Sequence, residues 1–271
     1  MTRLIRRPLA EWALCGALMF GVVSATRHLD HQLADSSVFT GWVLGSLIAL
    51  LAAFAIGKKL IPLAIGHASS WLRIHVLGGT LCLIVFWLHT GCLWPGGFYE
   101  KVLTVLFYSV MATGFVGILI QRRVPRRLNQ VGLEVLFERI PREIHHARTL
   151  AQGIVVECAD ETGSETLTRS YIETFGWYFE RPRFVLAELV FPGSGRHWLL
   201  REFEVVSRYL DRRELTYCDK LRHVAFHKRL LDLTYAYQLL LRSWLLLHVP
   251  LTASLVILAI WHIILMHVYL F

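Results

Sequence analysis

The sequence predicts an all-α integral membrane protein with five transmembrane helices and a mainly helical cytoplasmic insert between the fourth and the fifth. Hydrophobic residues make up 55% of the 271 residues, and the mean hydropathy of +0.49 is too high for an ordinary soluble protein. Five apolar runs are each long enough to cross a bilayer. The net charge of +8 is concentrated outside these runs, as in the cytoplasmic loops of membrane proteins.

The first four runs lie within residues 1–121. The first, at about residues 9–25, is interpreted as a membrane helix because no small-residue cleavage site and soluble domain follow it, as they would after a signal peptide. The second, at about 38–56, contains Gly41 and Gly45 at the spacing of closely packed membrane helices. The third and fourth cover residues 73–91 and about 102–120.

The third run carries two histidines, His75 and His89, fourteen positions apart. Fourteen steps of about 100° are nearly four full turns, so both imidazoles lie on one helix face, roughly 21 Å apart along the axis. The last run, within residues 241–271, repeats this spacing with His248 and His262. Two such helices can supply two stacked pairs of axial ligands, and two non-covalently bound haems b fit this pattern.

A single intramembrane histidine is more often a hydrogen-bonded core residue or a proton-relay group than a ligand. The repeat of both spacing and depth on a second helix favours ligation instead. Gly78 and Gly79 lie between the first two histidines, where small residues let a macrocycle edge approach closely. Plain helix packing explains these two glycines equally well.

Residues 122–240 form the one sizeable polar region, large enough for a small domain with a marginal core. Helical patterns appear near 133–150 and 196–214, and a helix from about Glu214 is expected to run straight into the last span, residues 241–271. The stretch between them, 153–184, is expected to be part strand and part loop. His223 and His227, at i and i+4, are a possible metal pair, but surface positions among four basic residues are favoured: Lys220, Arg222, Lys228 and Arg229.

The distribution of Lys and Arg predicts the topology, since positive charge collects on the cytoplasmic side. With the N-terminus inside and the C-terminus outside, only Arg27 and Lys101 are left outside. The third and fifth spans then run in the same direction. His75 meets His248 near the cytoplasmic side, and His89 meets His262 near the opposite side. The expected location is the bacterial inner (cytoplasmic) membrane.

Several classes of site are absent from the sequence. The five cysteines show neither the CxxC spacing of zinc or iron–sulfur sites nor the CxxCH of covalently attached haem. There is no GxGxxG turn and no P-loop. No aromatic-interleaved basic patch indicates binding of nucleic acid.

The layout resembles the ferric-reductase-type transmembrane domain, which is also found in NADPH oxidases, among the membrane cytochromes b. The resemblance covers mainly residues 38–121 and 240–271 and rests on four histidines: His75, His89, His248 and His262. It implies that the third and fifth helices, which are parallel in that family, bind two haems. The chain departs from the family in having no sixth span and no flavin or nicotinamide domain, so we do not expect it to oxidise NADPH by itself.

These observations together predict a di-haem b-type cytochrome, an electron-transfer subunit of a respiratory or other redox complex. Six-coordinate haem iron favours electron transfer over ligand binding. Membrane lipid, redox protein subunits such as a cytochrome or an iron–sulfur protein, and a quinone are the expected partners. Two alternatives from other classes are a histidine-based proton or ion transporter and a membrane anchor for a soluble complex, neither of which contains haem.

Overall fold

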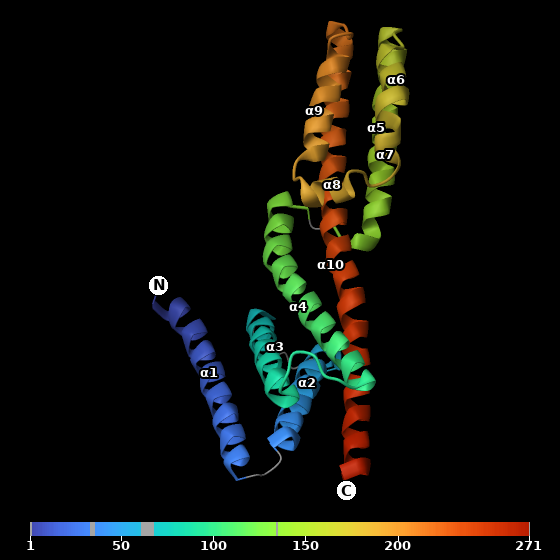
Figure 1. Ribbon diagram of the computed structural model, residues 1–271. Helices are drawn as coiled ribbons and strands as arrows, with labels where there is room; N and C mark the ends of the chain where they lie inside the picture. Colours follow the sequence, from blue (N-terminus) through green and yellow to red (C-terminus); the bar gives the residue numbers. More distant parts are fainter. Residues whose placement is uncertain (1, 33–35, 61–67, 134, 271) are drawn as a thin grey trace. The chain divides into compact units, whose positions relative to one another are not determined.

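The computed structural model describes the backbone of residues 2–32, 36–60, 68–133 and 135–270. Side chains are described for 12–32, 36–53, 72–133 and 135–269. Within these ranges every regular element is a helix and there is no strand, as Figure 1 shows. The chain divides into two compact units, the first made of residues 1–118 and 245–271 and the second of residues 119–244.

The elements of the first unit are long helices, of which α4 and α10 continue into the second unit. They are α1 (Thr2–His31), α2 (Ser36–Leu60), α3 (Ala68–Thr90), α4 (Phe98–Val131) and α10 (Arg212–Leu270). The second unit adds shorter elements: a 3₁₀ turn (Phe137–Arg139), α5 (Ile140–Thr162), α6 (Thr166–Ser170), a π-helical turn (Tyr171–Phe175), α7 (Gly176–Glu180), α8 (Val185–Val190) and α9 (Ser194–Ser207).

Four helices are long and apolar enough to cross a membrane. They lie in the segments Ser36–Ala53, Leu72–Thr90, Phe98–Val131 and Arg212–Tyr269. They cover the second, third, fourth and last predicted spans. The first predicted span lies in α1, which is helical but is not among these four; its side chains before Trp12 lie outside the described residues. The chain is therefore a helical membrane protein with four such helices among its described residues.

The first unit packs around a cluster of buried apolar side chains from α2, α3, α4 and α10, with Val85 and Phe107 nearly fully enclosed. The rings of Phe86 and Phe107 stack with centroids 4.2 Å apart, which joins α3 to α4. Gly78 lets α3 approach α2, because a Cβ there would lie 2.8 Å from Cδ2 of Leu51. This close contact is the one that small residues permit between membrane helices.

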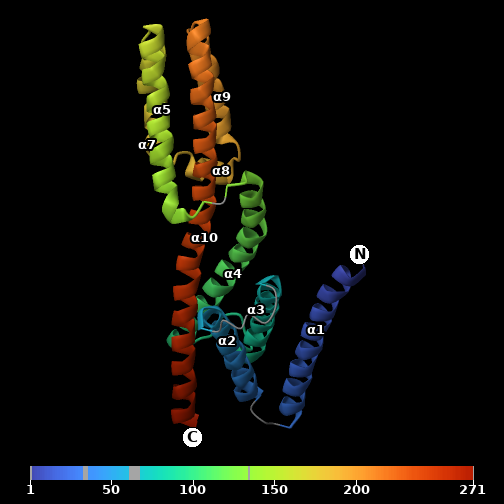
Figure 2. The same ribbon diagram turned by 180° about the vertical axis from the view of Figure 1, so that it is seen from behind.

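The second unit has a larger core than the sequence suggested. Five side chains that are completely buried anchor it: Phe175, Tyr178, Phe179, Leu199 and Phe203. In both views α5 and α9 lie beside the first half of α10, and the core fills the space between them (Figures 1 and 2). Many aromatic rings in a short stretch supply enough apolar area for a domain of this size.

The expectation of strand in residues 153–184 is wrong. Residues 153–162 belong to α5, and most of the remainder forms α6, the π-helical turn and α7. In α5 the buried residues recur at helical intervals: Ile140, Ile144, Ala147, Ala151, Val155 and Cys158. This pattern places one face of a helix in the core, and such packing outweighs the weak strand preference of the β-branched residues in the sequence IVV.

The expectation of one helix running from about Glu214 into the last span is confirmed, since α10 is continuous over 59 residues. Its start is fixed by a reciprocal cap. The Asp211 carboxylate accepts hydrogen bonds from the backbone N–H groups of Arg213 and Glu214, both at 2.8 Å, and the Glu214 carboxylate accepts one from the N–H of Asp211 at 2.9 Å. This is the capping-box arrangement, here with Asp at the N-cap.

Candidate functional site

The four predicted ligand histidines lie on the two helices that the sequence indicated, His75 and His89 on α3 and His248 and His262 on α10. All four are half-buried. The imidazole centroids of His89 and His262 are 6.4 Å apart, with ring planes at 83°. The structure thus places His89 beside His262.

A cavity of about 400 Å³ opens beside His89 and His262, between α2, α3, α4 and α10. Its volume falls in the range of ordinary small-molecule sites, about 300–1,000 Å³. The walls are mainly apolar, with Leu44, Phe86 and Phe107 among them, and Glu100 adds a carboxylate. A mostly apolar cavity with a few convergent polar groups is the usual form of a cofactor site.

The separation of His89 and His262 allows a test of whether a metal centre fits between them. Two imidazoles that bind one metal from opposite sides, each through a nitrogen about 2 Å from it, have ring centres roughly 6 Å apart. The observed 6.4 Å agrees with this arrangement. His89 and His262 would therefore be able to hold a metal-containing group between them. Among the described residues, no three His, Cys, Asp or Glu side chains are grouped to hold a bare metal ion.

Neighbouring helices hold two of the histidines through their Nδ1 atoms. Nδ1 of His89 donates to the backbone carbonyl of Ser37 at 3.0 Å and lies 3.3 Å from the hydroxyl of Thr40, both on α2. Nδ1 of His248 lies 2.8 Å from the hydroxyl of Thr113 on α4. Metal-bound histidines commonly use the second ring nitrogen in such hydrogen bonds, which orient the ring.

Further contacts surround His262. The ring of Tyr99 stacks on it with centroids 6.1 Å apart, and the Tyr99 hydroxyl donates to the carbonyl of Leu258 at 2.6 Å. His267 is exposed at the edge of the cavity, with its ring 5.5 Å from that of Trp42. The sequence offered no signal for these contacts, because they depend on how α4 and α2 pack against α10.

The glycines of α2 and α3 have different neighbours from those predicted. Gly78 packs against Leu51 of α2, and a Cβ on Gly79 would have nothing within 4 Å, so neither contacts a histidine. On α2, a Cβ on Gly41 would lie 2.9 Å from Cε1 of His89, and one on Gly45 would lie 3.4 Å from Ile263. The close approach predicted for Gly41 and Gly45 is therefore present, but the partner of Gly41 is a candidate ligand.

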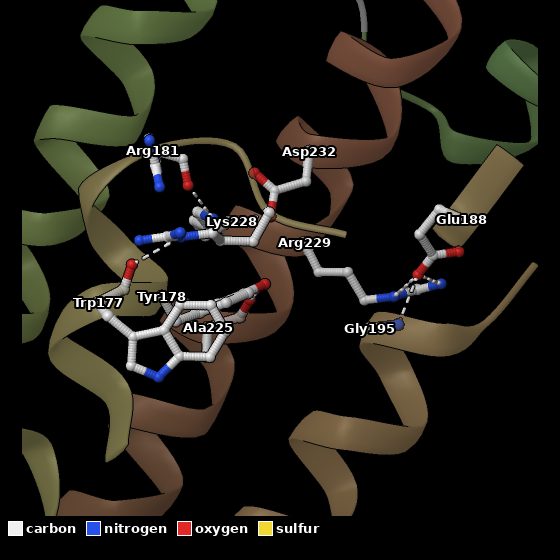
Figure 3. A network of polar contacts seen from close by, with 10 residues as sticks. Trp177, Tyr178, Arg181, Glu188, Gly195, Ala225, Lys228, Arg229 and Asp232 are labelled. Carbon is white, nitrogen blue, oxygen red and sulfur yellow. Dashed lines mark hydrogen bonds and ion pairs between the residues drawn. The ribbon is translucent and has the colours of Figure 1, made fainter. Parts of the chain in front are cut away.

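The second unit contains a buried polar network, shown in Figure 3, that the sequence did not reveal. Nζ of Lys228 lies 2.7 Å from Oδ2 of Asp232, with side-chain exposures of 0% and 4%, and donates to the carbonyl of Arg181 at 2.9 Å. Nearby, the buried Glu188 pairs with Arg229 at 3.3 Å. The expectation that Lys228 and Arg229 lie on the surface is thus wrong, because each has a carboxylate partner inside the core.

Burial governs the titration of this network, which precedes the apolar part of α10. Loss of hydration lowers the pKa of Lys228, and the same loss raises the pKa of Asp232. His223 and His227, by contrast, are exposed as expected and line a groove with His146.

The fold and the site therefore define a helical membrane protein in which α3 and α10 each carry two histidines, with His89 of α3 and His262 of α10 side by side at an apolar cavity. Comparisons with protein-family models, with curated proteins and with solved structures give no match.

Proposed function

We propose that this protein is a di-haem b-type cytochrome that moves electrons across the membrane as a subunit of a respiratory or other redox complex. The observation that carries the proposal is the pairing of His89 with His262 at 6.4 Å beside a cavity of about 400 Å³. The proposal includes a second haem at the other depth, held by His75 of α3 and His248 of α10. Haem held by two histidines supplies one-electron transfer.

The residues of this chain provide binding and orientation. His89 and His262 would hold one haem and His75 and His248 the other. Ser37, Thr40 and Thr113 orient two of these rings by hydrogen bonds. The apolar walls of the cavity exclude water, which stabilises bound porphyrin and keeps the site in a medium of low dielectric constant.

The proposal includes five spans, with α1 as the first, in the bacterial inner membrane. The N-terminus and residues 122–240 face the cytoplasm and the C-terminus faces outside, because this topology leaves only Arg27 and Lys101 outside. Electrons pass between a quinone pool or partner subunit and a second redox protein, such as a cytochrome or an iron–sulfur protein.

A reduced-minus-oxidised spectrum of the purified full chain, combined with a pyridine haemochrome assay, tests the proposal. We expect the α-band of low-spin haem b and two haems per chain. A chain without a haem spectrum would refute the proposal and favour a histidine-based proton or ion transporter or a membrane anchor.

A further inference from the structure

Two candidate ligands are held in the same way by different helices. On α2, Thr40 and Gly41 face His89; on α4, Thr113 and Gly114 face His248. In each case the threonine hydroxyl contacts Nδ1 of the imidazole, at 3.3 Å and 2.8 Å, and the adjacent glycine faces Cε1 of the same ring. The two dipeptides have the same sequence, Thr-Gly, and contact histidines that belong to different predicted pairs.

The hydrogen bonds of the two threonines indicate which ring nitrogen carries the proton. A hydroxyl has a single proton to donate. Thr113 Oγ1 is 2.9 Å from the carbonyl of Ser109, and Thr40 Oγ1 is 3.0 Å from that of Ser36, and both carbonyls can only accept. Because each hydroxyl proton points to a carbonyl oxygen, the hydroxyl oxygen accepts a hydrogen bond from Nδ1–H of its histidine. His89 gives independent support, since its Nδ1 also donates to the carbonyl of Ser37.

We propose that Thr40 and Thr113 are positioning residues that fix His89 and His248 as Nδ1–H tautomers, with Nε2 as the ring nitrogen that would bind a metal. This inference rests on the proposed function for its effect on haem, but the tautomer itself is a property of the chain. Each threonine acts on a different haem: Thr40 on the one that His89 and His262 would hold, and Thr113 on the one that His75 and His248 would hold.

The two glycines differ in how much room they leave. A Cβ on Gly41 would lie 2.9 Å from Cε1 and 3.3 Å from Nδ1 of His89, a contact too short for the ring to stay in place. A Cβ on Gly114 would lie 3.7 Å from Cε1 of His248, which is ordinary van der Waals contact. Gly41→Ala must therefore displace its histidine, whereas Gly114→Ala is a matched control that need not.

The test measures the redox midpoint potential and the low-spin electron paramagnetic resonance signal of each haem in the full chain. A hydrogen bond accepted from Nδ1–H makes the ligand more basic. Thr40→Val should raise the potential of the His89–His262 haem alone, and Thr113→Val that of the His75–His248 haem alone. Thr40→Ser and Thr113→Ser, which keep the hydroxyl, should restore both values. Gly41→Ala should lower occupancy of the first haem, and Gly114→Ala should leave both in place.

Shifts in both haems with either valine variant, or in neither, would overturn the proposal, as would equal effects of the two alanine variants. The ¹⁵N spectrum of histidine-labelled, haem-free chain is a readout that does not depend on the proposed function. We expect protonated Nδ1 at His89 and His248, with loss of this preference at His248 in Thr113→Val. Nε2-protonated rings in the wild-type chain would refute the inference even if haem binds, and absence of haem alone would refute only the proposed function.

Discussion

Replacing Lys228 with methionine should leave Asp232 as a buried carboxyl group without its cation. The two groups are 2.7 Å apart, with Lys228 0% and Asp232 4% exposed, so the loss is not screened by solvent. Removing one partner of a buried ion pair destabilises a protein by about 3–5 kcal/mol. At roughly 2–4 °C per kcal/mol for a chain of this size, Lys228→Met should lower the melting temperature by roughly 6–20 °C.

The matched control is the double variant Lys228→Met/Asp232→Leu, in which neither of the two positions carries a charge. Exchange of a whole buried pair for apolar groups is often neutral or stabilising by about 1–4 kcal/mol. We therefore expect the double variant to be at least as stable as wild type, and more stable than Lys228→Met or Asp232→Leu. Thermal unfolding of the full chain in detergent, followed by circular dichroism, gives the three comparisons.

The two single variants should also depend on pH in opposite directions, measured against the double variant. In Lys228→Met, the folded-state pKa of Asp232 is raised above its unfolded value. The buried carboxyl group is therefore neutral and harmless at low pH, and it destabilises the folded protein as pH rises through that pKa. In Asp232→Leu, the folded-state pKa of Lys228 is lowered, so the amine destabilises as pH falls through that pKa. Parallel pH profiles, or a Lys228→Met variant as stable as wild type, would refute the reasoning.

Four further predictions concern the membrane unit and the cysteines. His89→Ala should remove one of two haems in the pyridine haemochrome assay and leave the other spectrum intact; loss of both or of neither contradicts the pairing. Reporter fusions after residue 271 and within residues 122–240 should report opposite compartments, and agreement between them would disprove the topology. The isolated, flavin-free chain should not reduce its haem with NADPH but should do so with dithionite or a quinol analogue, because haem accepts single electrons whereas NADPH gives a hydride; rapid reduction by NADPH would return the chain to the ferric-reductase enzymes. A maleimide should label the exposed Cys92 in minutes while the buried Cys218, whose pKa burial raises to about 11, stays unmodified; equal labelling would argue against the core of the second unit.

Helical periodicity was sufficient to predict that His89 and His262 lie beside each other. Equal spacing on two membrane helices fixes both the face and the depth of His75, His89, His248 and His262, and these are local properties. The partners of His89 on α2 are a property of packing between helices, so Gly41 was interpreted as a helix contact and Gly78 and Gly79 as candidates for the cofactor.

In the polar region the misplaced residues are those whose tertiary partners are distant in sequence. Lys228 and Asp232 stand at the i, i+4 spacing of a surface ion pair, and only the aromatic core around Tyr178 buries them. Nζ of Lys228 lies 4.0 Å from the centre of the Tyr178 ring, fifty positions earlier in the chain. The helix of residues 153–162 was missed because a short β-branched run resembles a strand when its burial is unknown.

The unbroken course of α10 sets the rotational phase of the ligands. Each residue turns the helix by about 100°, so a single insertion between His248 and His262 would rotate one imidazole by that angle relative to the other. A seven-residue insertion would restore the direction to within about 20° while lengthening the connection by roughly 10 Å. Pro250, which removes one backbone hydrogen bond just beyond His248, is the place where the helix can absorb such a twist by bending.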